Sequence, residues 1–380
     1  MDIFSVVLVI LTVISVLVLD RSKFAIVQRI LKWIPAILFA YVIPALVTHL
    51  FQLDLSNVIL HRYSKDFIMP MAIIFVMSAL SFRQLKAVGM RPILVFLSGS
   101  LTVAIMPLVL LGIFSLFTTS FTDQIIGEEY WRGLVTLVGS WIGGSTSMLI
   151  LKELSGASES IFLVILVMDN VLVNIWTIFM FQKIKRSDAV NSFFNIQDTI
   201  QDFIPDTINL HQNGPAYSFI TLSTCIIVVV LSYFFVESFL FKIVLLSIIG
   251  LILGNIVKFW NHGLMIKGGG YLIITIMAIL GLKLNFSNFS IPLEVILFSV
   301  LWLISHYIIM MITAYILKLN MAWVPIASMA NVGGISTAPA VTKAYNEEWM
   351  PHAILLSILS MVTGTYWGML TIYLFTLFNT

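Results

Sequence analysis

The sequence predicts an all-α polytopic membrane protein with two inverted repeats of five transmembrane helices, each repeat carrying a re-entrant or broken Gly-Gly hairpin. Of its 380 residues 60% are hydrophobic and 10% are charged, and the mean hydropathy is +1.05. Soluble domains carry about 25% charged residues. Apolar runs of the roughly 20 residues that a bilayer crossing requires recur along the chain. A Gly-Gly motif followed by hydroxyl residues occurs in each half.

The N-terminal repeat is expected over residues 1–182. Its candidate spans are the apolar runs Ile3 to Leu19, Leu31 to Phe51, Phe67 to Phe82, Pro92 to Phe117 and Ile161 to Phe181. The first Gly-Gly stretch, Gly133 to Leu151, lies between the last two runs. Residues 183–215 are polar and begin with three cations, so they are predicted to form a cytoplasmic linker between the halves.

The C-terminal repeat is expected over residues 216–380. Its apolar runs are Ala216 to Val236, Phe239 to Val257, Tyr271 to Leu284, Val295 to Leu317 and Ala353 to Phe378, with the second Gly-Gly stretch at Met321 to Tyr345. Residues 77–83 (MSALSFR) also align with residues 277–283 (MAILGLK), and both segments end in a cation at the end of the third span. The order of elements and this local match favour a duplication.

The two Gly-Gly stretches are the most informative motifs. Residues 139–147 (GSWIGGSTS) recur loosely as residues 329–337 (MANVGGIST). Paired glycines each cost a helix about 1 kcal/mol, whereas Ser and Thr are preferred at a helix start. Irregular backbone is tolerated within a membrane where protein buries it or where it lines a cavity. Two such breaks in corresponding positions predict a transporter binding site.

The distribution of Lys and Arg favours re-entrant hairpins over crossing helices. With the N-terminus outside and both stretches re-entrant, 14 of the 20 Lys and Arg residues face the cytoplasm; the other six are Arg62, Lys65, Arg132, Lys152, Lys242 and Lys283. If both stretches cross, 11 face the cytoplasm and 9 face out. Five spans per repeat is an odd number, so the second repeat would be inverted. Each stretch is nevertheless long enough for an unwound crossing helix.

A helix that starts at a break directs free N–H groups and the positive end of its dipole into the gap, which suits an anion such as a carboxylate. The expected substrate-binding residues supply hydroxyl or amide groups, or let backbone approach a ligand closely: Gly143, Gly144, Ser145, Thr146, Ser147, Asn331, Gly333, Gly334, Ser336 and Thr337. Close helix packing, for which small residues are also used in membranes, is the alternative explanation.

Asp169 lies near the middle of a predicted span. A carboxylate there is costly and by default marks an ion path, a proton path or a substrate contact. Its oxygens could bind Na⁺, or it could carry a proton; a hydrogen-bonded structural Asp is the alternative. In the second repeat Ser360 aligns with Asp169, and Thr365 aligns with Asn174. The candidate coupling-ion residues are therefore Asp169, Asn170, Asn174, Ser360, Thr363 and Thr365.

Other classes of function find little support. No HExxH, GxSxG or P-loop motif is present, so we expect neither an enzyme nor a cofactor other than a coupling Na⁺. A net charge of +2 without a basic tail gives no reason to expect a nucleic-acid partner. The single cysteine, Cys225, forms no disulfide framework. His306 could relay protons or bond a backbone carbonyl.

The Gly-Gly-hydroxyl stretches, residues 168–170 (MDN) and residues 364–368 (GTYWG) resemble the membrane family catalogued as domain of unknown function 819. The architecture is more distantly similar to glutamate:sodium symporters and 2-hydroxycarboxylate transporters, which have inverted five-span repeats with Gly-Gly-x-Gly hairpins. Thr146 and Ser336 stand where those families have the last Gly. This resemblance implies Na⁺- or H⁺-coupled movement of a small carboxylate-bearing solute by a frequently homodimeric protein.

The leading hypothesis is a secondary transporter of the cytoplasmic (inner) membrane. It would carry an acidic amino acid, a di- or hydroxycarboxylate or a small acidic peptide in symport with Na⁺ or H⁺. A cation/proton antiporter that uses Asp169 is the second hypothesis. A membrane-embedded enzyme or an assembly scaffold is the third.

Overall fold

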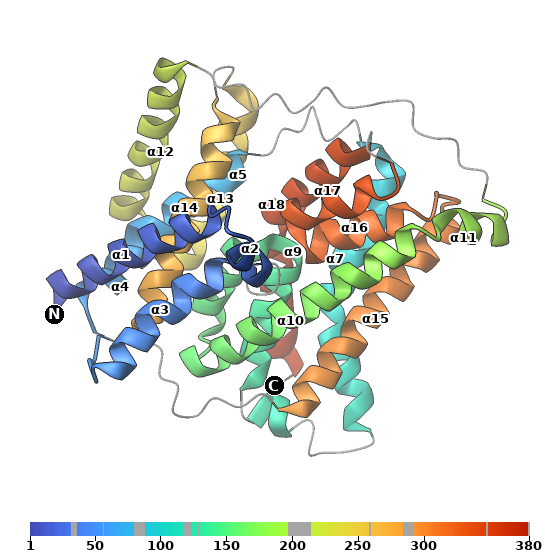
Figure 1. Ribbon diagram of the computed structural model, residues 1–380, viewed down its shortest axis with the longest axis horizontal. Coiled ribbons are helices and arrows are strands. Elements are labelled where there is room, and N and C mark those ends of the chain that lie inside the picture. Colours follow the sequence, from blue (N-terminus) through green and yellow to red (C-terminus); the bar gives the residue numbers. More distant parts are fainter. Residues whose placement is uncertain are drawn as a thin grey trace. The chain divides into compact units, whose positions relative to one another are not determined.

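The structure, a computed structural model, describes residues 1–31, 36–55, 57–79, 88–116, 123–127, 129–196, 214–257, 260–283, 292–346 and 349–378. Within these ranges all regular secondary structure is helical (Figure 1). Nine helices of the described chain are long and apolar enough to cross a membrane. The predicted all-helical, multi-pass membrane character is therefore confirmed.

The helices follow the predicted runs in order. In the N-terminal half they are α1 Asp2–Asp20, α2 Ala25–Leu31, α3 Ala36–Leu50, α4 Ile59–Tyr63, η1 Ser64–Ile68, α5 Met69–Ser78, α7 Met90–Ser115, η3 Asp123–Gly127, α9 Tyr130–Ser155 and α10 Glu159–Ile184. A short helix, α11 Ser187–Phe193, opens the segment expected to be a linker. The C-terminal half contains α12 Pro215–Phe235, α13 Phe239–Ile256, α14 His262–Gly281, α15 Leu293–Ile316, α16 Trp323–Val332, α17 Gly334–Lys343 and α18 Met350–Phe378.

The third span of each half begins earlier than hydropathy indicated. Instead of starting at Phe67, helical structure runs without a gap from α4 through η1 to α5. Two of the charges that hid this start form an ion pair, because Arg62 Nε lies 3.6 Å from Asp66 Oδ2 one turn away. Likewise α14 begins at His262 rather than Tyr271, where the Asn261 side chain accepts a hydrogen bond from the Leu264 N–H at 2.9 Å. The expected ends, Phe82 and Leu284, lie outside the described residues.

The chain divides into two compact units, and each draws on both halves of the sequence. Unit 1 comprises Met1–Ala79, Ser158–Val171 and Leu210–Ser290, and unit 2 comprises Leu80–Ala157, Leu172–Asn209 and Ile291–Thr380. The chain passes from one unit to the other between the third and fourth spans of each half, between α9 and α10, within α10, and between Asn209 and Leu210. The compact units therefore differ from the two sequence repeats.

In unit 1, α5 packs on α13 and α14, and α3 packs on α1 and α14. The helices approach each other closely at two glycines: Gly254 lies against the backbone of Ser78, and Gly281 lies against the carbonyl of Tyr41. A larger side chain at either glycine would collide with backbone. Small residues at helix crossings are a usual means of close packing in membranes.

Unit 2 contains both Gly-Gly segments. Within it α7 packs along α15, and α18 packs on α9, on α7 and on the helix pair α16 and α17. Figure 1 draws α16 and α17 side by side next to α18. Every residue of α16 is buried, which places the first limb of the second Gly-Gly segment in the interior of this unit.

Two helical hairpins as a candidate binding site

The first Gly-Gly segment reverses direction. Helix α9 spans 26 residues, and Gly144 in its middle has φ +66° and ψ −165°. Arg132, near the start of α9, donates from Nη1 to the Ser155 carbonyl at 3.0 Å, and Ser155 Oγ donates to the Arg132 carbonyl at 3.2 Å. In a straight helix the 23 intervening steps would separate these residues by about 35 Å. Although its length and hydropathy suit a crossing helix, α9 is therefore a hairpin that turns at Gly144.

The second Gly-Gly segment has the same shape. Helices α16 and α17 meet at Gly333 and Gly334, and Gly334 has φ +67°. At the open end of this hairpin Asn320 Nδ2 donates to Tyr345 Oη at 3.1 Å. The ring of Trp323, the first residue of α16, stacks on Trp349 with centroids 4.8 Å apart. The chain thus returns to the place where the hairpin began.

Glycines at corresponding positions have the same structural role in both hairpins. The second glycine of each pair, Gly144 or Gly334, adopts a positive φ that side chains disfavour. The first glycine lies against the hydroxyl of the residue four positions later: Ser147 covers Gly143, and Thr337 covers Gly333. Each turn therefore needs Gly-Gly followed by a hydroxyl, which is the pattern that the sequence repeats.

The two turns converge within unit 2. Ser360, on α18, donates its Oγ hydrogen to the Ile142 carbonyl at the first turn, and the same Oγ lies 3.3 Å from Asn331 Oδ1 beside the second turn. The Asn331 amide is held from the other side, because Ser100 Oγ donates to its Oδ1 at 2.9 Å and its Nδ2 donates to the Phe96 carbonyl at 3.2 Å. One serine thus connects the two hairpins.

Helix α18 also presses on the first turn. Gly364 lies against Ile142 and Gly143 with no room for a side chain. One residue later, Thr365 Oγ1 donates to Ser147 Oγ at 3.0 Å. Thr363, by contrast, donates to the Leu359 carbonyl of its own helix at 3.0 Å. Two of the three α18 residues expected to bind a coupling ion therefore contact the first hairpin directly.

Two predicted hydroxyls have no hydrogen-bond partner among the described residues. Thr146 is 5% exposed, and its Oγ1, like Thr337 Oγ1, is buried without a donor or acceptor in the described part of the chain. Leaving a polar atom buried and unsatisfied costs about 1–3 kcal/mol. Each turn therefore holds a hydroxyl that a ligand or water would satisfy, although the positions differ: Thr146 lies two residues after Gly144, and Thr337 lies three residues after Gly334. Ser145 is half-buried, and the side chain of Ser336 lies outside the described residues.

The residues of α10 expected to bind an ion fall in different units. Asp169, which is 6% exposed, and Asn170 belong to unit 1, whereas Asn174 belongs to unit 2. The Asn170 amide donates to the Leu166 carbonyl of its own helix at 2.7 Å. Among the described residues no three His, Cys, Asp or Glu side chains gather into a metal site.

A hydrogen-bond chain that the sequence did not predict involves Ser328 of the second hairpin. Trp176 Nε1 donates to Ser328 Oγ at 3.0 Å, and Ser328 Oγ lies 3.1 Å from His306 Nε2. His306 Nδ1 lies 3.1 Å from the Gly99 carbonyl, which can only accept, so the neutral Nδ1–H tautomer satisfies every contact. His306 is therefore the carbonyl-bonded residue of the two alternatives. The sequence signal for this hydrogen-bond chain was Gly99, which lies between Ser98 and Ser100.

A family model described as "Protein of unknown function (DUF819)" matches residues 7–378, which include both hairpins, α10 and α18. No curated protein matches the chain. Since the match covers nearly the whole sequence, this chain belongs to the DUF819 family.

Proposed function

We propose that this protein is a secondary active transporter that moves a small carboxylate-bearing solute by alternating access, coupled to Na⁺ or H⁺. The convergence of two Gly-Gly hairpins on one buried network, with an unsatisfied hydroxyl at each turn, carries the proposal. The solute would bind between Thr146 and Thr337. Transport in the cytoplasmic membrane as a homodimer is part of the same proposal.

The polarity of the two turns favours an anion. The returning limb of the first hairpin starts after Gly144, and α17 starts at Gly334, so each turn exposes the N-terminus of a helix. Unsatisfied N–H groups there carry roughly half a positive elementary charge. Ser145 and Thr146 lie in the first turn of the returning limb, where their hydroxyls add donors. Two such ends directed at one solute suit a carboxylate better than a cation.

The hairpin geometry supports the re-entrant, inverted arrangement. Because Arg132 bonds Ser155, and Asn320 bonds Tyr345, each hairpin would leave the membrane on the side where it entered. Five crossing elements then remain per half: α1, α3, α4 with α5, α7 and α10, followed by α12, α13, α14, α15 and α18. An odd number inverts the second half and brings the two turns toward the midplane from opposite sides.

Flux into proteoliposomes tests this proposal. We expect uptake of at least one solute from a panel of acidic amino acids, dicarboxylates and small acidic peptides when a Na⁺ or pH gradient is imposed. Thr146→Val should raise the KM of that uptake, whereas Thr136→Val should not. Thr136 is the matched control, because it lies buried on the same helix with its hydroxyl bonded to the Gly133 carbonyl at 2.7 Å. Absence of flux for the whole panel would contradict the symporter proposal.

A cation/proton antiporter is the second candidate, favoured by the burial of Asp169 within an apolar helix. A carboxylate within a membrane span is a default indicator of an ion or proton path. Antiport predicts Na⁺ efflux that responds to an imposed pH gradient without any organic solute. Asp169→Asn should abolish that efflux, and efflux that survives the substitution would exclude Asp169 as the ion site.

A further inference from the structure

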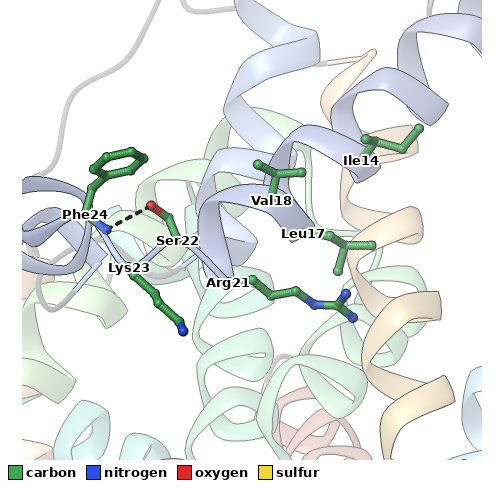
Figure 2. Close-up of a pocket in the computed structure, with 7 residues that line it drawn as sticks. All are labelled: Ile14, Leu17, Val18, Arg21, Ser22, Lys23 and Phe24. Carbon is green, nitrogen blue, oxygen red and sulfur yellow. Dashed lines mark hydrogen bonds between the residues drawn. The ribbon is translucent and has the colours of Figure 1, made fainter.

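A cavity that transport does not explain lies in unit 1 at the C-terminal end of α1 (Figure 2). Its volume is about 540 Å³. One wall is apolar and consists of Ile14, Leu17 and Val18, whereas the other end carries Arg21 and Lys23. The cavity therefore joins a hydrocarbon-like surface to a positive charge.

The apolar wall suits an acyl chain. Ile14, Leu17 and Val18 follow the spacing that places side chains on one helix face. Ile14 is 53% exposed and Val18 is 64% exposed, on a helix apolar enough to cross a membrane. The distance along α1 from Ile14 to Arg21 is about 10 Å at 1.5 Å per residue. This length matches the upper part of a lipid chain that runs down from its headgroup.

The charged end suits a phosphate. Arg21 Nη2 donates to Tyr271 Oη at 2.8 Å, which fixes the guanidinium and leaves its other N–H groups available. Neither Arg21 nor Lys23 forms an ion pair within the described residues, and both are exposed. In Figure 2 both side chains point away from the ring of Phe24. The exposed carboxylate of Asp20 is the nearest opposing charge in sequence, and it does not line the cavity.

The end of α1 does not itself repel an anion strongly. Its last carbonyls are partly satisfied, because Leu17 O accepts from the Arg21 N–H at 3.2 Å and Leu19 O accepts from the Ser22 N–H at 3.0 Å. Ser22 Oγ in turn accepts from the Phe24 N–H at 3.3 Å. The two cations therefore dominate the field at the mouth of the cavity.

We propose that this cavity binds an anionic phospholipid, with the phosphodiester between Arg21 and Lys23 and one acyl chain along Ile14, Leu17 and Val18. Basic residues just beyond a transmembrane helix attract anionic lipids. Arginine provides several N–H donors in a geometry suited to phosphate. The site is independent of the hairpins, so it stands whether or not the protein transports a carboxylate.

The test compares binding of phosphatidylglycerol and phosphatidylcholine with identical acyl chains to the detergent-solubilised full-length protein by native mass spectrometry. Each cation is expected to contribute about a fivefold factor, so the double variant Arg21→Gln/Lys23→Gln should bind phosphatidylglycerol about 25-fold more weakly. Its weak binding of phosphatidylcholine should not change. The control is Arg91→Gln/Lys318→Gln, which removes two exposed cations at other helix ends and should leave both affinities unchanged.

A second pair of measurements separates a lipid from other occupants. Val18→Ser should weaken the binding of phosphatidylglycerol, but it should leave any binding of glycerol phosphate unchanged. If glycerol phosphate displaces phosphatidylglycerol at similar concentrations, the site recognises phosphate alone and the lipid proposal fails. It also fails if the cation variants bind phosphatidylglycerol like the parent protein. A shift in oligomer mass without a change in lipid binding would assign the cavity to a second copy of the chain.

Discussion

Replacing the two unsatisfied hydroxyls should separate stability from transport. Thr146→Val and Thr337→Val keep the shape of the side chain and each remove a buried hydroxyl that has no hydrogen-bond partner in the ranges that the structure describes. An unsatisfied buried polar group costs about 1–3 kcal/mol, so each variant should match or exceed the parent protein in stability. A hydrogen bond to a charged solute contributes about 1.5–3 kcal/mol. Its loss should raise the KM about 10- to 150-fold at 1.36 kcal/mol per decade.

The matched controls are buried threonines whose hydroxyls are satisfied within their own helices. Thr136 on α9 bonds the Gly133 carbonyl at 2.7 Å, and Thr342 on α17 bonds the Ala338 carbonyl at 2.7 Å. Their valine variants should transport normally and should not gain stability. The assays are the thermal midpoint in detergent and the concentration dependence of uptake in proteoliposomes. The reasoning is refuted if Thr146→Val and Thr337→Val lose stability while their KM stays unchanged.

Three further predictions concern packing and pH. Gly144→Ala and Gly334→Ala should each lower the thermal midpoint and uptake, because residues with a side chain disfavour the positive φ. The control is Gly270→Ala in α14, which should change neither quantity. Equal midpoints for all three variants would contradict the turn geometry. Gly364→Ala should abolish uptake, because the added methyl group would force α18 away from the first turn. Normal uptake by this variant would contradict the close contact between α18 and the first turn. Burial raises the pKa of Tyr345, so its contribution to stability is present below pH 10.0, the ordinary value, and is lost at higher pH. Tyr345→Phe should therefore flatten the alkaline part of the stability profile, and an unchanged profile would contradict this.

Much of the candidate site could be predicted from sequence because its elements are local. A glycine at φ +66° and a hydroxyl over the preceding glycine need only a short stretch of chain, and the motif GGSTS encodes both. Hydropathy located the long spans for the same reason. It misplaced the start of the third span of the first half, because an ion pair one turn apart, Arg62 with Asp66, is invisible to an average over single residues.

The remaining features depend on contacts between distant segments. The contact between Arg132 and Ser155, which brings the two ends of α9 together, cannot be predicted from hydropathy and length. In the sequence Ser360 is one more hydroxyl residue in an apolar helix. Its role as a link between the hairpins depends on its contacts with the Ile142 carbonyl and Asn331, which are distant in sequence. The division into units that each combine two sequence halves is equally a property of tertiary packing.

Solute protection of the two turns tests the central claim most directly. In a Cys225→Ala background, Ser145→Cys and Ile335→Cys place one reactive thiol at each turn. A carboxylate from the transport panel should slow maleimide labelling of both thiols with the same half-maximal concentration, because one solute would occupy both turns. Protection of neither thiol, or of only one, by every carboxylate in the panel would contradict a shared anion site.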